Sequence, residues 1–590
     1  MQSVTRWIWI ALAGVLAYMY VPKLLNGSTD ASQPIGVGVT ETANFDVGSD
    51  APEKCTIKGQ KFGAELSTRG AALVDYYLTD DKRYTEKGQP IELTTVPASA
   101  PDRFNLHFDW RALGTTGDNA QVAHDVVDWT IESHDEKSCT FTYSDDHVKL
   151  TKAFRAGDGP YEFLTKVTIE NTGDDKRVHR LGVENTAWRT HAETDSHLGR
   201  QSPFVTEVMC AHDAGKLDRK GLSDFAPKDF EKPEFEKGFF VQRGPIDFAA
   251  TANAYFAQAI VPLSGPAAPV CGLQVEERWY KAQFADKTKD PSYGAMYRSR
   301  LVYPQKELAP KESATYELAA YYGPKDRTYL AKALGGQHHL SEIINLGMFT
   351  VVSKVIVMFL LKAHDIVGDW GISIIILTIC VRILLFPLTW KQIKSMVAMR
   401  RLKPELDALN AKFKDDPQQK QVATMEVYRK NGVNPFGGCL PVFVQMPVWW
   451  ALYTVIQTAV ELYHTPFLWY SDLSAPDPYF ILPLVLGGTS FVQQKLMPQQ
   501  MDAAQQKMML YFMPALFTVM MLFLPAGLGI YMLTNSILGI VQQQVVERVA
   551  PRSQEIEVRE KDSGGKGQSG KKDEQGKLAG TLPAKLKGGS

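Results

Sequence analysis

The fold class is decided by one stretch, Gly371-Ile-Ser-Ile-Ile-Ile-Leu-Thr-Ile-Cys-Val-Arg-Ile-Leu-Leu-Phe-Pro-Leu-Thr-Trp390. Its length matches the ~20 residues that a helix needs to cross a bilayer. Its one charged residue, Arg382, lies nine residues before Lys391, and the helical rise places it ~13 Å inside the segment. An arginine at the centre of a membrane helix costs about 2.5–3.5 kcal/mol on insertion scales and usually faces a bundle interior or a wet cavity. The stretch predicts a polytopic α-helical membrane protein, and a side chain that snorkels to the membrane surface is the alternative reading of Arg382.

Five further apolar segments predict the remaining membrane helices. They cover residues 7–21, 441–463, 479–492, 508–524 and 528–541. We therefore predict six transmembrane helices, with an N-terminal anchor in residues 1–25 and five core helices in residues 368–546. A cleaved signal peptide is the alternative for the first segment, but Tyr18, Met19 and Tyr20 lie where a cleavage site needs small residues.

Loop charge predicts the orientation of these helices. Residues 391–434 carry ten basic and five acidic side chains, and residues 546–590 carry ten basic and seven acidic side chains. The positive-inside rule places both segments, and with six helices both termini, in the cytoplasm. This parity holds only if the apolar stretch 346–361 does not cross the bilayer. We therefore interpret residues 341–363 as an amphipathic helix that lies in the membrane interface.

The overall composition excludes several classes of protein. The chain is 45 % apolar and 22 % charged, with a net charge of −1. These values exclude a disordered chain and a collagen-like fibre, and they disfavour a free nucleic-acid binder. The averages conceal a polar block and a membrane block, and the polar block has an acidic balance once the two basic segments are set aside.

The polar block predicts a large exported β domain. Residues 26–54 are rich in Ser, Thr, Gly and Asp and are typical of a flexible linker. Residues 55–335 contain many short alternating segments, such as 161–170, which is followed by the turn signal Asn171-Thr-Gly-Asp174. Helical periodicity is scarce there, so we predict a sandwich of antiparallel sheets.

Four of the six cysteines fall in this domain: Cys55, Cys139, Cys210 and Cys271. An oxidising compartment would permit disulfides, and four cysteines allow three connectivities. Free buried thiols are the alternative. The spacings match no zinc pattern, so we expect no metal site.

Polar residues within the membrane segments predict a site. Thr378 precedes Arg382 by one helical turn and shares its face, Gln445 lies within 441–463, and the last segment contains Thr534, Asn535 and Ser536. Each alone is typical of a helix–helix hydrogen bond. Together with Arg382, for which no neutralising acid is evident, they predict a hydrated groove that attracts acidic groups of an incoming polypeptide.

No motif predicts catalysis. The chain has no Gly-x-Ser-x-Gly elbow and no His-Glu-x-x-His site. The tail sequence 565–571 nearly matches a phosphate loop, but Lys572 replaces the required Ser or Thr. We therefore expect no catalytic residues, no cofactor and no nucleotide hydrolysis.

The basic segment 391–434 has a helical pattern that breaks at Asp415-Asp416-Pro417. This pattern predicts a cytoplasmic hairpin of two antiparallel amphipathic helices with a basic surface. A merely solvated topology determinant is the alternative. Residues 547–590 are rich in Gly and Lys and predict a disordered basic cytoplasmic tail.

One motif carries a family resemblance. Asn434-Pro-Phe-Gly-Gly-Cys-Leu-Pro-Val-Phe-Val-Gln-Met-Pro447 resembles the signature of the YidC family of membrane protein insertases. The segments around Arg382, Asp472-Leu-Ser-Ala-Pro-Asp-Pro-Tyr479, Pro525-Ala-Gly-Leu and Gln542-Gln-Gln544 extend the resemblance over about residues 368–546. The layout resembles the Gram-negative form, which carries a periplasmic β-supersandwich domain.

The resemblance implies a function and partners. Members insert proteins into the bacterial inner membrane, alone or beside the Sec translocon, and help others fold; the implied partners are nascent membrane proteins, the ribosome and membrane lipids. The positions that match the family's client groove are Arg382, Thr378, Gln445 and Tyr531. Met532 departs from enterobacterial relatives, which carry a second tyrosine there.

Two other functions compete with insertion. A secondary transporter would need coupling acids and inverted repeats, and the sequence shows neither. A carbohydrate-active periplasmic domain on a membrane anchor would need a His/Glu acid–base pair in a cleft.

Overall fold

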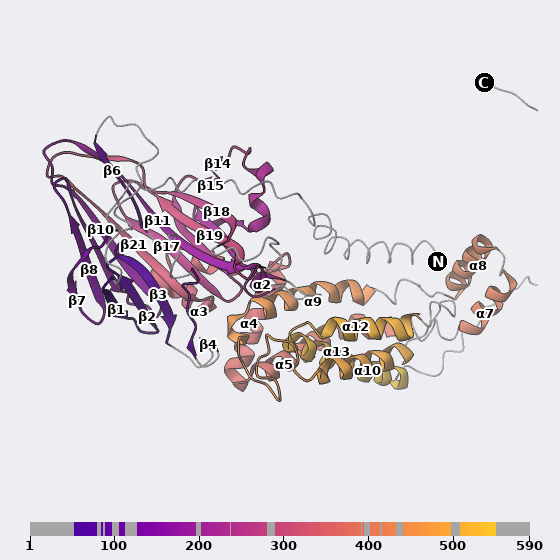
Figure 1. Ribbon diagram of the computed structural model, residues 1–590. Helices are drawn as coiled ribbons and strands as arrows, with labels where there is room; N and C mark the ends of the chain where they lie inside the picture. Colours follow the sequence, from indigo (N-terminus) through magenta and orange to yellow (C-terminus); the bar gives the residue numbers. More distant parts are fainter. Residues whose placement is uncertain are drawn as a thin grey trace, which may run out of the picture.

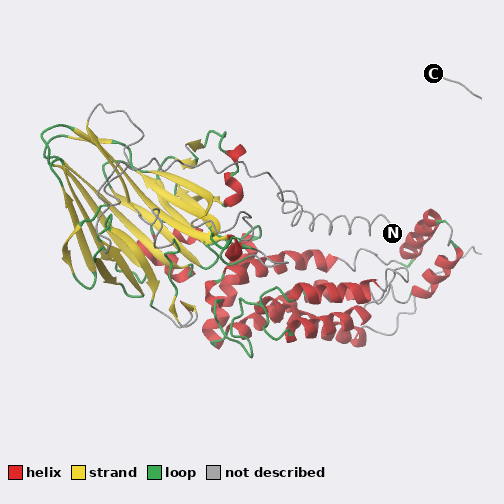
Figure 2. Ribbon diagram, in the orientation of Figure 1, coloured by secondary structure: helices red, strands yellow, loops and turns green. Residues whose placement is uncertain are grey.

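The chain forms a β body and a helical body that touch end to end (Figures 1 and 2). The computed structural model describes residues 52–79, 84–86, 89–96, 106–112, 127–195, 202–236, 238–279, 290–390, 392–393, 402–413, 416–431, 440–496 and 508–549. The expected anchor in residues 1–25, most of the expected linker 26–54 and most of the expected tail 547–590 lie outside these residues.

The largest sheet of the β body has nine antiparallel strands. In spatial order they are β13 (Lys216–Lys220), β12 (Glu207–His212), β16 (Ile246–Ala252), β17 (Phe256–Ser264), β21 (Ser313–Pro324), β10 (Glu162–Asn171), β9 (Val148–Ala156), β8 (Ser138–Ser144) and β7 (Thr130–His134). The alternating segment 161–170 forms β10, where Phe163, Val167 and Ile169 are buried. The prediction of an antiparallel β domain is confirmed.

A second sheet packs on the first, since β12 contacts β18 and β16 contacts β19. Its strands are β14 (Phe235–Glu236), β15 (Phe239–Gln242), β18 (Val270–Trp279), β19 (Tyr293–Val302), β11 (Arg177–Thr190) and β20 (Lys306–Leu308), and β6 (Leu106–Ala112) also pairs with β11. Two small sheets complete the body: β1 (Lys54–Lys58), β2 (Phe62–Ser67) and β3 (Ala72–Leu78), and the pair β4 (Thr85–Glu86) and β5 (Gln89–Pro90).

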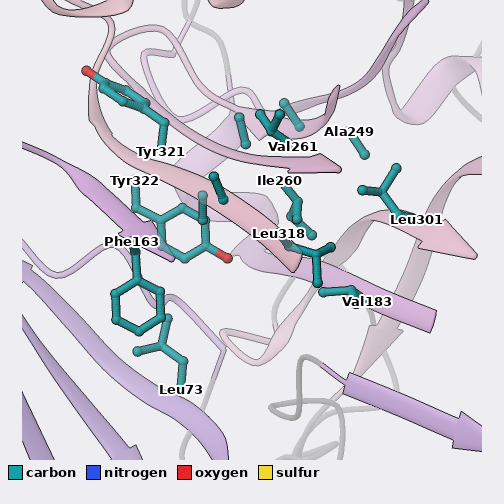
Figure 3. Close-up of a cluster of buried hydrophobic side chains, with 14 of the residues drawn as sticks. Leu73, Phe163, Val183, Ala249, Ile260, Val261, Leu301, Leu318, Tyr321 and Tyr322 are labelled. Atoms are coloured by element: carbon teal, nitrogen blue, oxygen red, sulfur yellow. The ribbon is translucent and has the colours of Figure 1, made fainter. Parts of the chain in front are cut away.

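The core of the β body lies between these sheets. Figure 3 shows Leu73 of β3, Val183 of β11 and Leu301 of β19 close to Phe163 and Leu318 of the nine-stranded sheet. All five belong to one continuous buried cluster. Three sheets therefore share one hydrophobic core.

Two disulfides join sheets to one another. Cys55 on β1 pairs with Cys139 on β8, and Cys210 on β12 pairs with Cys271 on β18. Each bond links strands that share no hydrogen-bonded ladder. The four cysteines of the β body are thus oxidised, and one of the three possible connectivities is selected.

The helical body consists of short and medium helices. They are α4 (Thr350–Val367), α5 (Trp370–Leu384), α7 (Lys403–Lys412), α8 (Pro417–Lys430), α9 (Leu440–Thr458), α10 (Ile481–Leu496), α12 (Met513–Met521), which follows a π-helical turn at Met508–Phe512, and α13 (Ala526–Val549). Among the helices in the described part of the chain, none is both long enough and apolar enough to span a bilayer. The count of six membrane helices stays a prediction.

Two expected helices have different limits. The segment 371–390 was expected as one helix, but α5 ends at Leu384, and helix resumes at Phe386. Pro387 explains the break, because its ring nitrogen cannot donate to the preceding turn. Expected helix 341–363 begins only at Thr350, because Gly347 adopts a left-handed conformation (φ 70°) and donates to Asn345 Oδ1 at 2.9 Å.

The two bodies meet at the connection that follows α9. There η10 (Val460–Leu462) is buried, and Val460 belongs to the core cluster of the β body. Arg327, the first residue of α3 (Arg327–Lys332), donates from Nη1 to both carboxylate oxygens of Glu461, at 2.7 and 2.8 Å. The ring of Tyr463 packs on that of Tyr255, with centroids 4.7 Å apart.

Candidate functional site

Arg382 is held against α13 by neutral groups. Its Nε donates to Asn535 Oδ1 at 2.6 Å, and Nη2 donates to the Asn535 main-chain oxygen at 2.6 Å. Its Nη1 donates to Gln542 Oε1 at 3.2 Å. The planar guanidinium thus bridges two turns of α13, a geometry that a lysine cannot reproduce. The structure thus brings together Arg382 and Asn535, two of the residues predicted for the groove.

A glycine leaves room for the guanidinium. A Cβ added to Gly539 would lie 3.1 Å from Arg382 Nη2 and 3.3 Å from Gln493 Nε2. These distances are tighter than most real Cβ contacts, so a larger residue would displace one of the two side chains. Gln493 on α10 therefore lies at the same point as Arg382 on α5 and Gly539 on α13.

A second polar contact lies one turn along α13. Gln445 on α9 donates from Nε2 to the hydroxyl oxygen of Tyr531, which is buried on α13. Tyr531 and Asn535 are four residues apart and share one face of the helix. The face of α13 that carries Tyr531, Asn535, Gly539 and Gln542 is therefore a polar stripe between α5, α9 and α10.

Two predicted residues lie apart from this polar stripe. Thr378 is fully buried, and its hydroxyl donates to the Ile374 main-chain oxygen at 2.7 Å within α5. Ser536 follows Asn535 by one residue, which turns its side chain about 100° around the helix axis. The sequence places Thr378 and Arg382 on one face of the helix. At Thr378 that face is buried by helix packing, and its hydroxyl is used within α5.

The sequence did not identify three residues at or beside the polar stripe as site residues: Gln493, Gly539 and Gln542. Gln542 appeared only as part of the family motif Gln542-Gln-Gln544. Its distance of eleven residues from Tyr531, three helical turns, is a signal that could have placed it on the same face. No sequence signal identifies Gly539, because its role depends on where the guanidinium of Arg382 lies.

Glu461 does not balance the charge of Arg382. Glu461, at the end of the α9 segment, pairs instead with Arg327 of the β body. Within the described residues, no carboxylate lies at ion-pair distance from Arg382. The arrangement therefore provides a fixed positive group whose partners are all uncharged.

Helices α7 and α8 lie in the segment that was expected to form a basic hairpin. They pack on each other through Leu402, Leu406, Val427 and Tyr428. Asp416 lies between α7 and α8, and its side chain caps α8 by accepting from Gln418 N and Gln419 N. The sequence 415–417 was expected to break the helical pattern, and the two helices are separated there. On the outer side of α8, Val422 and Met425 are exposed.

One cavity of the β body is small. A cavity of about 30 Å³ is lined by polar groups that include Glu184, Asn185 and Gln258. Ligand pockets for small molecules span about 300–1,000 Å³, so this cavity has the size of a water site. A His–Glu contact does exist, at 3.2 Å between His191 Nε2 and Glu277 Oε1, but neither residue lines the cavity. Within the described residues, no group of His, Cys, Asp or Glu is placed to hold a metal ion.

Comparison with known families matches both bodies. Residues 54–359 match the family model described as "YidC periplasmic domain", and residues 362–554 match the model described as "60Kd inner membrane protein". The junction between the two matches falls within α4.

Curated relatives match over most of their length. The membrane protein insertase YidC of Anaeromyxobacter dehalogenans (strain 2CP-C) is 36% identical over 527 residues, which cover 85% of this chain and 87% of that protein. The insertase YidC of Geotalea daltonii is 30% identical over 560 residues, with 92% and 98% covered. A solved structure, an active YidC insertase crystal structure with the first transmembrane domain resolved, is 18% identical, with 84% of this chain and 93% of that chain covered and a TM-score of 0.35.

Proposed function

We propose a function from one premise: the chain belongs to the YidC family of membrane protein insertases. We infer that it inserts nascent proteins into the bacterial inner membrane and assists their folding. The observation that carries the proposal is the polar stripe on α13, where Asn535 and Gln542 hold Arg382 and no described carboxylate lies at ion-pair distance from it.

The polar stripe supports a hydrated groove as the client site. Side chains from α5, α9 and α10 meet it, namely Arg382, Gln445 and Gln493. Three hydrogen bonds fix the guanidinium before any client arrives, so the positive charge needs no rearrangement to receive an acidic or polar group. Thr378 and Ser536 flank this groove rather than line it in the proposal.

The proposed mechanism of insertion depends on a polar groove within a body whose outer surface is apolar. The groove is proposed to open to the cytoplasm and to lipid and to be closed toward the periplasm. The polar flank of a client enters beside Arg382 and avoids dry hydrocarbon. The apolar segment of the client then moves into lipid, driven by about 0.8 kcal/mol per buried CH₂ group.

The basic helices supply a receiving surface. The pair α7 and α8 is proposed to lie in the cytoplasm, with Val422 and Met425 exposed for apolar segments and Arg429 and Lys430 exposed for acidic ones. This hairpin and the tail in residues 547–590 are proposed to contact the ribosome, and the core to act alone or with the Sec translocon. The energy comes from burial of the client, without nucleotide hydrolysis.

The proposed topology is that of the family. Six membrane helices hold the chain in the inner membrane, both termini lie in the cytoplasm, and the β body lies in the periplasm. The interfacial segment is proposed to be α4, whose residues Val351, Val355 and Met358 are exposed, as is Met348 just before the helix.

Site-specific photocrosslinking tests the groove. A photoreactive amino acid replaces Gln445 in one variant and its neighbour Met446, which is half exposed and points about 100° away, in the other. Ribosome-stalled single-span chains of increasing length are then presented to native membranes. We expect crosslinks from position 445 only at intermediate chain lengths, when the segment passes the groove.

The pattern of crosslinks decides the proposal. Equal crosslinking from positions 445 and 446 at all lengths would mean that clients slide over the lipid-facing surface. Crosslinks from α8 without any from position 445 would make the protein a docking chaperone. Either result would overturn the groove as the route.

Variants of Arg382 test the role of the charge. Arg382→Lys keeps the charge and should be mild, and Arg382→Ala should impair some clients more than others, because Asn535, Gln542 and Gln445 still hold water. Growth after depletion of the wild-type protein measures both effects. Equal loss with both variants would contradict an electrostatic role.

A further inference from the structure

The connection between η10 and α10, residues 463–480, turns large apolar side chains outward; we name it the aromatic loop. Its exposed members are Leu468 (73%), Trp469 (42%), Tyr479 (66%) and Phe480 (50%). The aromatic loop contains no Lys or Arg. A soluble loop of this length would normally place such residues inward and charges outward.

The two carboxylates of the aromatic loop accept hydrogen bonds from nearby groups. Asp477 is 3% exposed and accepts from Leu482 N at 2.6 Å and from Tyr479 N at 3.1 Å, which caps the start of α10. Asp472 accepts from His464 N, Ser474 N and Ser474 Oγ. Both carboxylates thus bind groups close to them in sequence, and Asp477 is removed from the outer surface of the loop.

The same contacts fix the position of the indole. Trp469 Nε1 donates to Asp477 Oδ1 at 3.3 Å, and the Trp469 ring packs on Tyr470 with centroids 4.8 Å apart. A short bridge between Phe467 and Tyr470 closes the tip of the loop on which Leu468 and Trp469 lie. The exposed tip is therefore an ordered structure.

The backbone at the two most apolar exposed positions is strained. Leu468 has a φ of 53° and Phe480 a φ of 58°, a conformation that large side chains rarely adopt. Such strain is unfavourable and persists where the surrounding structure or a function maintains it. Packing within the protein covers only part of these side chains, since Leu468 is 73% and Phe480 50% exposed.

The apolar surface continues from the aromatic loop onto α10. Ile481, Leu484 and Val485 are exposed at 43%, 66% and 44%, and their spacing places them on one face of the helix. Under the proposed function this face meets lipid. The aromatic loop therefore extends a lipid-facing surface to the point where the bilayer ends.

We propose that the aromatic loop anchors the outer end of the helical body in the membrane interface. Leu468 and Phe480 insert into the acyl-chain boundary of the periplasmic leaflet. Trp469 and Tyr479 lie at the headgroup level, where amphipathic rings are favoured. The occupant of this surface is the lipid bilayer itself. The inference rests on the proposed function, because it takes the helical body to be embedded in a membrane.

The anchor has a consequence for the β body. The aromatic loop begins at Tyr463, directly after Val460 and Glu461, which dock into the β body. Anchoring the loop therefore fixes the height of the β body above the membrane as well as the outer ends of α9 and α10.

Spin-label accessibility in the full-length protein tests the anchor. Cys380 and Cys439, the cysteines outside the disulfides, are replaced by Ser, and single nitroxide labels are placed through Leu468→Cys, Phe480→Cys, Leu484→Cys or Ser471→Cys. The protein is held in nanodiscs of phosphatidylethanolamine and phosphatidylglycerol. Ser471 is an exposed polar residue of the same loop and serves as the matched water control, and Leu484 is the lipid control.

The ratio of collision with oxygen to collision with a water-soluble nickel complex reports depth. We expect the ratios at positions 468 and 480 to lie close to that at 484 and several-fold above that at 471. Ratios at 468 and 480 equal to that at 471, with 484 in lipid, would overturn the anchor and leave the proposed function intact. A water-like ratio at 484 would instead overturn the membrane placement on which both depend.

A second measurement separates lipid from client. Ribosome-stalled chains are added to the labelled nanodiscs. Protection of position 468 that appears only with these chains would overturn the lipid anchor, because it would identify a client surface. Unchanged, lipid-like ratios at 468 and 480 before and after addition would support the anchor.

Discussion

The two bodies of the chain place their large apolar side chains in opposite ways. Among the described residues, the exposed large hydrophobic side chains of the β body are Phe230 and Leu263, and all the others lie at Met348 or beyond. The β body buries its aromatic residues between sheets, whereas the helical body exposes Ile383, Leu484 and many like them. This difference is what the proposed function requires of one body in water and another in lipid.

Polar groups follow the reverse distribution. In the helical body, Arg382, Asn535 and Gln542 gather where three helices meet. In the β body, charged side chains lie mostly at the surface, and the buried Glu184 is paired with Arg298 at 3.3 Å. A polar interior inside an apolar exterior is the arrangement that an insertion groove requires.

The largest expected effect is on the stability of the β body, whose sheets are joined by disulfides. Replacing Cys210 and Cys271 together by Ser should lower the free energy of unfolding of the β body by about 4 kcal/mol, because the bond closes a long loop in the unfolded chain. Guanidinium denaturation followed by near-ultraviolet circular dichroism measures this loss. The control is Cys380→Ser, since Cys380 is an exposed free thiol on α5 and should not shift the midpoint. A comparable shift in both variants would contradict the assignment of the effect to the disulfide.

The next effect tests whether the two bodies behave as one unit. Arg327→Met leaves Glu461 buried without its partner, which should cost about 3–4 kcal/mol. The loss should appear as separate unfolding transitions of the two bodies in calorimetry of the detergent-solubilised protein. The double variant Arg327→Met with Glu461→Gln removes the unpaired charge and should recover part of the loss. No recovery would show that packing at Val460, rather than the ion pair, joins the bodies.

The stability of the β body should depend on pH, because its interior holds a buried histidine, His179. Burial, with a smaller contribution from Lys306, lowers the pKa of His179 to about 4, against about 6.5 in an unfolded chain. Between these values the unfolded chain binds a proton that the folded domain does not, so stability falls as the pH falls from 6.5 to 4. The shift corresponds to about 3 kcal/mol.

His179→Gln provides the comparison. His179 Nε2 lies 2.7 Å from the Tyr316 hydroxyl, and a glutamine can still accept from that hydroxyl without titrating. Thermal unfolding of both proteins at pH 4 to 7 should show a steeper loss for the wild type. Parallel curves would mean that other groups cause the acid sensitivity.

Much of the fold was predictable because its signals are local. Alternation in 161–170 predicted β10, and Asp416-Pro417 marked the start of α8 by a cap and a proline in the first turn. Helix limits were less predictable. The end of α5 before Pro387 and the late start of α4 after Gly347 depend on single residues that an average over a window conceals.

The candidate site was predictable in part for the same reason. An arginine in an apolar segment is visible in any sequence, as are Gln445 and Asn535. The contact from Arg382 to Gln542 spans 160 residues, and the space at Gly539 exists only because three helices converge. Thr378 matched the periodicity of the site and still turned its hydroxyl to its own backbone.

The sequence by itself determined the division into a β block and an apolar block, the presence of four cysteines in the former and one deep positive charge in the latter. These follow from hydropathy and periodicity, which act over a few turns or strands. Tertiary structure alone decided that Cys55 pairs with Cys139 and Cys210 with Cys271, and that Glu461 pairs with Arg327 rather than Arg382. Such choices depend on which distant segments pack together, because the gain from burying a charge or closing a loop exists only once its partner is in place.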